Sequence, residues 1–232
     1  MKWPFYHLAR LEYAYKHARE NVRKIILKYV KDKNHGQMVL FEKTLVAPCG
    51  ITADQDILFG LSKSFYGIDI SPEALKSCPR NVITREGNIL DSGYGDEFFD
   101  FIACFLFLHH VHKTGFGAFL KEFHRLLKKS GCLIILEPSS RYPLSRLMDL
   151  GRKIFGNISG LVPDEAPVDP DKLKASIEDS GFRIRLFKSV SFSHNRIPLP
   201  FQHLVNIITN PLQGVWPFSR AGWLCVWICE KI

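Results

Sequence analysis

The sequence lacks the long apolar stretches of membrane-spanning helices and the paired cysteines of common zinc sites. No stretch of about 18 uncharged apolar residues occurs, the length that a membrane-spanning helix needs. The longest apolar runs, Phe101–Leu108 and Trp223–Cys229, have the length of buried strands. The N-terminus shows no signal-peptide pattern, so we expect a cytoplasmic protein. The six cysteines include no C-x-x-C pair, which argues against a zinc site and a disulfide framework.

The composition is that of an ordinary globular protein. Of 232 residues, 46% are hydrophobic and 23% are charged, enough for one large α/β domain with a buried core. The net charge is +8, and residues 1–35 hold nine Lys and Arg against three Asp and Glu. Such a segment either attracts an anionic substrate, an acidic lipid surface or nucleic acid, or is the solvated face of a helix.

Apolar residues in the first 35 positions recur at spacings of three and four, which predicts one helix from about Leu8 to Val30. They are Leu8, Leu11, Tyr15, Ala18, Val22, Ile25 and Tyr29. We expect residues 1–35 to form a helical cover that packs on the main domain or closes over its cleft.

After Gly36, short apolar runs alternate with helical segments. We expect strands near 43–48, 64–69, 81–86, 99–106, 132–137, 182–187 and 223–229, and helices near 53–62, 72–78, 116–129, 140–155 and 170–179. This alternation predicts a Rossmann-like, doubly wound α/β fold with a seven-stranded, mostly parallel sheet and an antiparallel last strand. Residues 36–232 form this domain, with a cap or insertion at about 139–168 and at 194–220, where the proline-rich sequence shows no clean periodicity.

One pattern indicates a nucleoside-binding enzyme. Pro48-Cys49-Gly50 lies at a strand-to-helix turn, and Asp69 follows about twenty positions later at the end of the next strand. In doubly wound folds the backbone of such a turn approaches the ligand, and the acid binds the ribose hydroxyls.

Five segments then resemble, in order, the motifs of the class I S-adenosylmethionine-dependent methyltransferases. They are the turn at 47–50, Tyr66–Leu75, Glu86–Asp91, Phe99–Val111 and Phe119–Pro138, and the whole run, from about 44 to 137, covers about 40% of the chain. The chain departs from the family at the first motif, where Val46 replaces an acid and Pro48-x-Gly50-x-Thr52 replaces G-x-G-x-G. The resemblance implies S-adenosylmethionine as cofactor and methyl transfer by direct displacement.

The resemblance also implies roles for particular residues. The main chain of Ala47, Pro48, Cys49 and Gly50, with that of Cys104 and Phe105, would hold the methionine part. Asp69 would accept hydrogen bonds from the ribose, although it could instead cap the helix that begins near Pro72. Ile70 and Ile89 would sandwich the adenine ring, and Asn88 would accept from its amino group.

Candidate catalytic residues lie at the ends of the fourth and fifth strands. His110 is the first candidate to contact the cofactor or the acceptor, with His109 beside it, and Glu137 either faces the acceptor or bonds to neighbouring backbone. Together with His112 these histidines make a poor metal site, because no acid or thiol lies at matching spacing.

The acceptor is expected to be a small molecule, anionic or amphiphilic, because the two cap segments mix aromatic and aliphatic residues with arginines. No nucleic-acid module is recognisable, and the oligomeric state is unknown. Two alternatives stay open: a non-catalytic binding or regulatory subunit that kept the fold, and an NAD(P)-dependent oxidoreductase. The second should show a fuller G-x-G-x-x-G.

Overall fold

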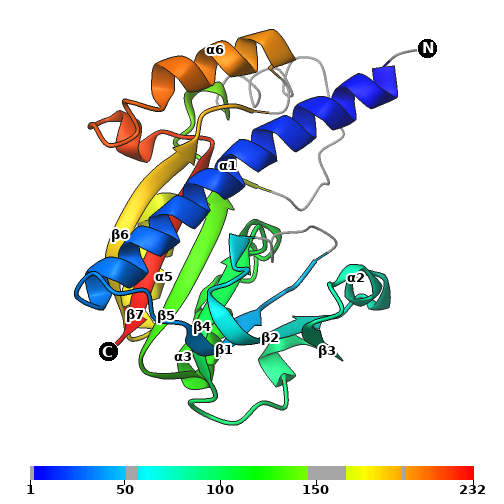
Figure 1. The fold of residues 1–232 in the computed structure, drawn as a ribbon, viewed down its shortest axis with the longest axis vertical. Helices are drawn as coiled ribbons and strands as arrows, with labels where there is room; N and C mark the ends of the chain where they lie inside the picture. The colour runs from blue at the N-terminus through cyan, green and yellow to red at the C-terminus, as the bar shows by residue number, and fades with distance from the viewer. Residues whose placement is uncertain (1–2, 51–56, 146–165, 195–196) are drawn as a thin grey trace.

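The computed structural model describes residues 3–50, 57–145, 166–194 and 197–232, and the side chains of these ranges from residue 12 onward. Seven strands form one sheet in the order β3-β2-β1-β4-β5-β7-β6 (Figure 1). The strands are β1 Phe41–Val46, β2 Ser62–Asp69, β3 Val82–Glu86, β4 Phe99–Phe105, β5 Leu127–Pro138, β6 Phe182–Ser191 and β7 Leu224–Lys231. Only β7 among them runs antiparallel to its neighbours, so the predicted mostly parallel α/β sheet is confirmed.

Helices cover both faces of this sheet. They are α1 Trp3–Lys33, α2 Pro72–Ser77, α3 Gly117–Leu126, α5 Pro170–Asp179 and α6 Leu199–Thr209, with short 3-10 turns η2 Ile89–Asp91, η3 Leu108–His110 and η4 Phe218–Arg220. None of the helices in the described part of the chain is long and apolar enough to cross a bilayer.

Alternation along the strands divides the core into two layers. In β5, Ile134 and Leu136 point to a cluster that includes α1, whereas Leu133 and Ile135 point to one that includes α3 and α5. Successive side chains of a strand point to opposite faces, so a continuous apolar run such as 132–136 is what a strand buried on both faces requires.

Helix α1 packs its buried side chains into the core of the molecule. Its buried row, spaced four residues apart, is Ala14, Ala18, Val22, Ile26 and Val30. The helix crosses in front of the sheet in Figure 1. Of the expected stripe, Tyr15, Ile25 and Tyr29 flank this row, and Leu8 and Leu11 lie outside the described side chains. The expectation that the stripe packs on the main domain is met.

Two helices begin at capping residues that can be recognised in the sequence. Ser71 caps α2 by accepting from the Ala74 amide, and Pro72 opens that helix. Asp169 accepts from the amides of Asp171 and Lys172 at the start of α5, where Pro170 comes first. A side-chain oxygen at the cap satisfies amides that lack a partner within the helix, and proline fits there because it has no amide hydrogen to lose.

Several expected elements differ. Residues 194–220 are not irregular throughout, because α6 runs from Leu199 to Thr209. Its prolines lie before and within the first turn and after the last, where they are compatible with a helix. The helix expected near 116–129 ends at Leu126, and the chain enters β5 directly. Parts of the helices expected near 53–62 and 140–155 lie outside the described residues, and 57–60 form a short turn.

Candidate active site

The carboxyl ends of the parallel strands β1 to β5 meet at one edge of the sheet. The strand order reverses between β1 and β4, because β2 and β3 lie on one side of β1 while β4 and β5 lie on the other. Open α/β sheets bind ligands at the carboxyl edge of such a switch point. The expected site residues follow the ends of these strands.

The turn after β1 is joined to the end of β2 by a carboxylate. Oδ2 of Asp69 accepts the backbone amide of Gly50 at 2.8 Å, and Oδ1 accepts the amide of Ser71 at 2.9 Å. Asp69 is only 8% exposed. Gly50 has φ +61°, which is strained for any residue with a Cβ, so the glycine here meets a backbone requirement.

The helix-capping alternative for Asp69 is not what the structure shows. Ser71 is the residue that caps α2, with its side chain accepting from Ala74 at 3.3 Å. Each Asp69 oxygen uses one of its lone pairs for an amide, which leaves acceptor capacity on both oxygens. A pair of vicinal hydroxyls is a suitable donor for that capacity.

The end of β3 lies beside Asp69. Asp69 is paired with Glu86 across the two strands, and the carbonyl of Asp69 accepts from the Gly87 amide at 2.9 Å. Asn88 then caps η2, where its Oδ1 accepts from the Leu90 amide at 3.0 Å. Ile89 is buried in the core, whereas Ile70 is 74% exposed. Of the two expected adenine contacts, Ile70 is therefore the one that offers open apolar surface.

The end of β4 completes this part of the edge. The Ala47 amide donates to the carbonyl of Ala103 at 3.0 Å, which fixes the start of the turn beside β4. Cys104 and Phe105 follow and are buried. Burial raises the pKa of the Cys104 thiol, with the Glu137 carboxylate adding to it, and burial together with Cys78 raises that of Cys49. Both thiols are therefore protonated packing groups at neutral pH.

A buried carboxylate organises the loop after β4. Glu137 is fully buried, and its Oε1 accepts from the amides of Phe107 and Leu108 at 2.7 and 2.6 Å. Its Oε2 lies 2.8 Å from Nδ1 of His109. Of the two roles expected for Glu137, the structure shows the bonds to neighbouring backbone. A buried carboxylate needs such partners, and here they are the first amides of η3 and an imidazole.

The contact with Glu137 also sets the protonation of His109. A carboxylate can only accept, so Nδ1 carries the hydrogen and Nε2 keeps its lone pair in the neutral ring. The ring of His110 lies 4.0 Å from that of His109, centroid to centroid, and His110 is exposed. His112 contacts the carbonyl of His109 through Nδ1 at 3.0 Å. No group of three metal-binding side chains occurs among the described residues.

The sequence did not reveal the Glu137–His109 pair. The sequence predicted that both residues lie at strand ends on one edge of the sheet, and it took His110 as the first catalytic candidate. Spacing alone cannot decide which of two neighbouring histidines on a loop meets a given carboxylate. The signal that could have found the pair is that both residues follow the ends of successive parallel strands, whose carboxyl ends meet at one edge of the sheet.

Comparison with known proteins agrees with this arrangement. Residues 46–135 match the family model of a methyltransferase domain. A similar structure is that of an S-adenosylmethionine-dependent methyltransferase of Thermotoga maritima, described as a possible histamine N-methyltransferase. Its TM-score is 0.63 at 18% identity, over 97% of this chain and 94% of that one. A comparison with curated proteins finds no significant match.

Two further structures share the fold. An S-adenosylmethionine-dependent methyltransferase of Methanosarcina mazei has a TM-score of 0.58 and 18% identity, over 87% of this chain and 96% of that one. A possible exported protein of Bordetella parapertussis has a TM-score of 0.61 and 14% identity, over 94% of this chain and 68% of that one.

The fold and its carboxyl edge define a doubly wound α/β enzyme of the kind that binds a nucleoside cofactor. The matched segment runs from the last residue of β1 into β5 and contains the Gly50–Asp69 contact. Residues 46–135 match a methyltransferase domain, and the fold around them is that of S-adenosylmethionine-dependent methyltransferases, enzymes whose cofactor is S-adenosylmethionine.

The residues present fit that cofactor at its nucleoside end. Asp69 has acceptor capacity for a ribose, and Ile70 beside it is an exposed apolar side chain. The fit is less complete toward the methionine end, because Val46, where the family has an acid, is buried in the core. The amides of Ala47, Cys49 and Gly50 already donate to the carbonyls of Ala103 and Ile68 and to the Asp69 carboxylate.

Proposed function

We propose that this enzyme transfers a methyl group to a small-molecule acceptor, with the cofactor bound at the ends of β1 to β4 and the acceptor bound beside η3. The observation that carries the proposal is the Asp69–Gly50 contact of 2.8 Å at the switch point of the sheet. This hydrogen bond brings together the two parts of the nucleoside-binding pattern, the glycine turn after the first strand and the acid expected to bind the ribose.

The cofactor supplies a sulfonium methyl group, which is already activated for displacement. The protein therefore has mainly to align the acceptor and to exclude water. In this proposal Asp69 and Asn88 bind the ribose and the adenine amino group, Ile70 and Ile89 contact the adenine ring, and the main chain of Ala47 to Gly50, with Cys104 and Phe105, holds the methionine part.

His109 is the group that we propose to remove a proton from the acceptor. Glu137 holds its Nδ1 at 2.8 Å and so directs Nε2 away from the carboxylate. A buried carboxylate also stabilises the imidazolium that forms when Nε2 takes a proton. In this proposal His110, whose ring lies against that of His109, contacts the acceptor. Glu137 positions His109 and need not touch the acceptor itself.

The acceptor is an amine or a hydroxyl, because both are nucleophiles that a neutral histidine assists. The mixture of arginines with aromatic and aliphatic residues in the sequence of segments 139–168 and 194–220 supports an anionic or amphiphilic molecule. The similar Thermotoga maritima structure is described as a possible histamine N-methyltransferase, which makes small amines a sensible first panel. A cytoplasmic location remains part of the proposal.

Calorimetric titration of the protein with S-adenosylmethionine, S-adenosylhomocysteine and NADH tests the cofactor. Tight binding of the first two and none of the third is the expected result. Methyl transfer to amine and hydroxy-acid panels, followed with labelled cofactor, then tests the acceptor. Binding without transfer to any acceptor would favour the regulatory alternative, and binding of NADH alone would reject the proposal.

A further inference from the structure

Helix α6 turns its polar side chains inward and its apolar side chains outward. Gln202 and Asn206, one turn apart, are both buried. The opposite face is apolar and exposed, from 51% to 71% of each side chain, and consists of Phe201, Leu204, Ile207 and Ile208. A surface helix of a globular protein normally has the reverse pattern.

Hydrogen bonds hold the helix in this orientation. The Ser193 hydroxyl donates to Oδ1 of Asn206 at 2.5 Å, and Nδ2 of Asn206 donates to the Tyr13 hydroxyl of α1 at 3.3 Å. Nε2 of Gln202 donates to the carbonyl of Ile197 at 2.7 Å. Turning the apolar face inward would break these bonds and strand buried polar groups, so the outward apolar face belongs to the fold.

The apolar surface continues beyond the helix. Val215, Trp216 and Phe218 follow it in sequence and are exposed, Trp216 at 77%. We refer to Phe201, Leu204, Ile207, Ile208, Val215, Trp216 and Phe218 as the α6 patch. Figure 1 shows α6 at one end of the long axis of the molecule, where it forms an outer rim. Contiguous exposed apolar surface of this kind marks a contact site.

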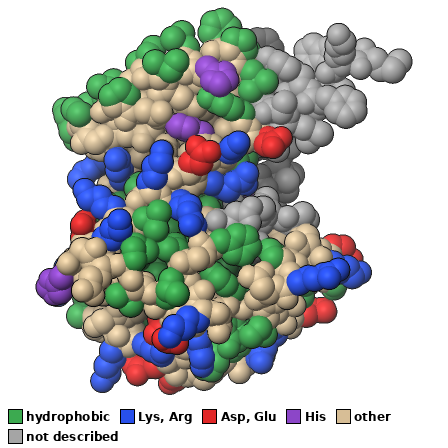
Figure 2. Space-filling view, viewed as in Figure 1, with side chains coloured by type: hydrophobic (Ala, Val, Ile, Leu, Met, Phe, Trp, Pro, Cys, Tyr) green, Lys and Arg blue, Asp and Glu red, His purple; other side chains and the backbone are tan. Residues whose placement is uncertain are grey.

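The charge around the patch is mostly positive. Residues 180–229 contain no Asp or Glu and five Lys or Arg. On the adjacent α1, one exposed row carries Lys16, Lys24 and Lys28, together with the acids Glu12 and Glu20. Figure 2 shows apolar side chains over α6 and, below them on the same side of the molecule, a band of Lys and Arg with some Asp or Glu side chains among them. An anionic surface complements this excess of positive charge, and residues 180–229, which include α6 and the segment after it, carry no acid that would repel it.

We propose that the α6 patch docks on an anionic lipid bilayer, with the apolar side chains in the interface and the lysines of α1 and Arg220 facing the headgroups. A short helix with apolar residues on its outer face, followed by an exposed tryptophan and bordered by cations, resembles the helices that lie in the plane of a membrane surface. Lysine and arginine near such a surface add attraction to acidic lipids.

This docking would bring the candidate active site close to the membrane. Strand β6 runs parallel to β5, because both are antiparallel to β7, and α6 follows the carboxyl end of β6. The α6 patch therefore lies on the side of the sheet edge that carries Glu137 and His109. The inference rests on the surface alone and would stand if the acceptor were not a lipid.

Co-flotation of the purified full-length chain with vesicles tests the inference. Vesicles of phosphatidylcholine with about one third phosphatidylglycerol should bind the protein, and pure phosphatidylcholine vesicles should bind it much more weakly. Replacing both Ile207→Ser and Trp216→Ser should lower the partition coefficient about tenfold or more, because both side chains leave the interface. Ile83→Ser, at a 55% exposed position on β3, is the matched control and should leave binding unchanged.

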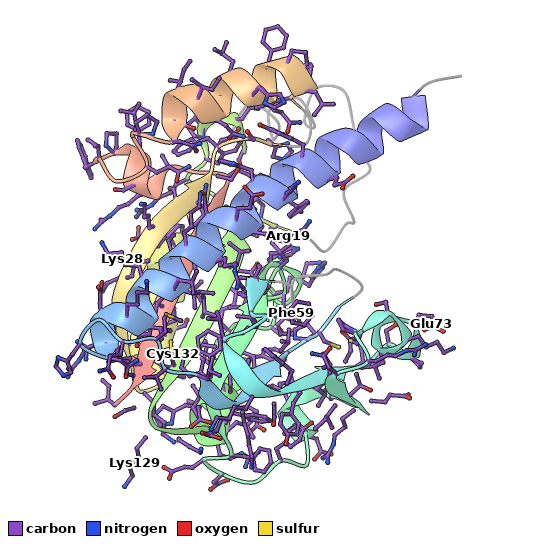
Figure 3. All side chains as sticks on the ribbon, in the orientation of Figure 1. Arg19, Lys28, Phe59, Glu73, Lys129 and Cys132 are labelled. Atoms are coloured by element: carbon purple, nitrogen blue, oxygen red, sulfur yellow. The ribbon has the colours of Figure 1, made fainter. Side chains whose placement is uncertain are left out.

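The electrostatic part has its own variants. The pair Lys24→Glu and Lys28→Glu should weaken binding to anionic vesicles, as should raising the salt from about 0.1 M to about 1 M. Lys129→Glu is the control, because Lys129 lies at the opposite end of the molecule from α6 (Figure 3).

Three results would overturn the inference. They are absence of binding to anionic vesicles, unchanged binding of the Ile207→Ser, Trp216→Ser variant, and a concentration-dependent dimer that this variant abolishes without any binding to lipid. The last result would identify a second copy of the chain as the occupant. Circular dichroism of each variant should remain that of the parent protein, and a variant that unfolds is replaced by Phe201→Ser.

Discussion

The amide of Gly50 donates to the carboxylate of Asp69 at 2.8 Å although the residues lie 19 positions apart in the chain. The contact joins the ends of two neighbouring parallel strands at the point where the sheet order reverses. It makes the acid at once a structural anchor for the turn and the candidate partner of the ribose.

Replacing Asp69→Ala should weaken S-adenosylmethionine binding by about 1.5–3 kcal/mol, the scale for losing hydrogen bonds to a charged group. Calorimetric titration measures this change. Asp69→Asn is the matched control, since the amide oxygen still accepts from Gly50, and it should lose less affinity. An unchanged dissociation constant in Asp69→Ala would remove the proposed ribose contact.

Replacing Gly50→Ala should lower cofactor affinity by making the turn adopt a conformation that costs about 1–2 kcal/mol for a residue with a Cβ. The backbone φ of +61° is the reason. Gly117→Ala, where a Cβ would meet nothing within 4 Å, should leave the affinity unchanged. Equal affinities of the two variants would show that the turn is not demanding.

Replacing His109→Gln should slow methyl transfer by a factor of about 10² to 10⁴, the usual contribution of a general base. Cofactor affinity should stay near that of the parent, because the ring is not assigned to the cofactor. His110→Gln serves as comparison and should act mainly on the KM for the acceptor. If His110→Gln were the slower variant in kcat, the order of the two histidines would be reversed.

Replacing Glu230→Gln should destabilise the protein at neutral pH but not in acid. Burial alone would raise the pKa of Glu230, but hydrogen bonds from Tyr29, Lys33 and Arg185 outweigh it and lower that pKa to about 2. A depressed folded pKa means that the carboxylate contributes stability above its unfolded value of about 4.5, and that this stability is lost as the pH falls toward 2.

Denaturant unfolding measures that pH dependence. At pH 7, Glu230→Gln should lower the free energy of unfolding by about 1–2 kcal/mol relative to the parent protein, a figure reduced for partial solvent screening of the carboxylate. This difference between variant and parent should shrink steadily below pH 4. Glu178→Gln, which breaks an exposed ion pair with Lys174, should cost less than about 0.5 kcal/mol at either pH. A Glu230→Gln deficit that persists at pH 2.5 would contradict this account.

Much of the fold follows from local rules. The apolar runs, the cap residues Ser71 and Asp169 and the alternation of strands and helices act over short stretches of chain, and the seven strands were found within a few residues. The predictions of secondary structure were wrong where neighbouring residues favour different structures. In the sequence, the prolines around 199–209 suggest a break in helical structure. In the structure they lie just before α6, in its first turn and after its last turn, where a helix tolerates them.

The candidate cofactor site could also be proposed from the sequence, because its residues follow strand ends at characteristic spacing. The partners of those residues were not. Nothing local says that Asp69 would bond the amide of Gly50, that Ser71 would take the capping role, or that Glu137 would accept from Phe107 and Leu108.

The sequence by itself determined the α/β architecture, the strand ends on which Gly50 and Asp69 lie, and the excess of positive charge, since periodicity, spacing and composition are properties of the chain. Only the tertiary structure decided that His109 rather than His110 pairs with Glu137, and that α6 faces outward with its apolar side. Both depend on which groups meet across the fold, where hydrogen bonds to buried polar atoms outweigh the local pattern.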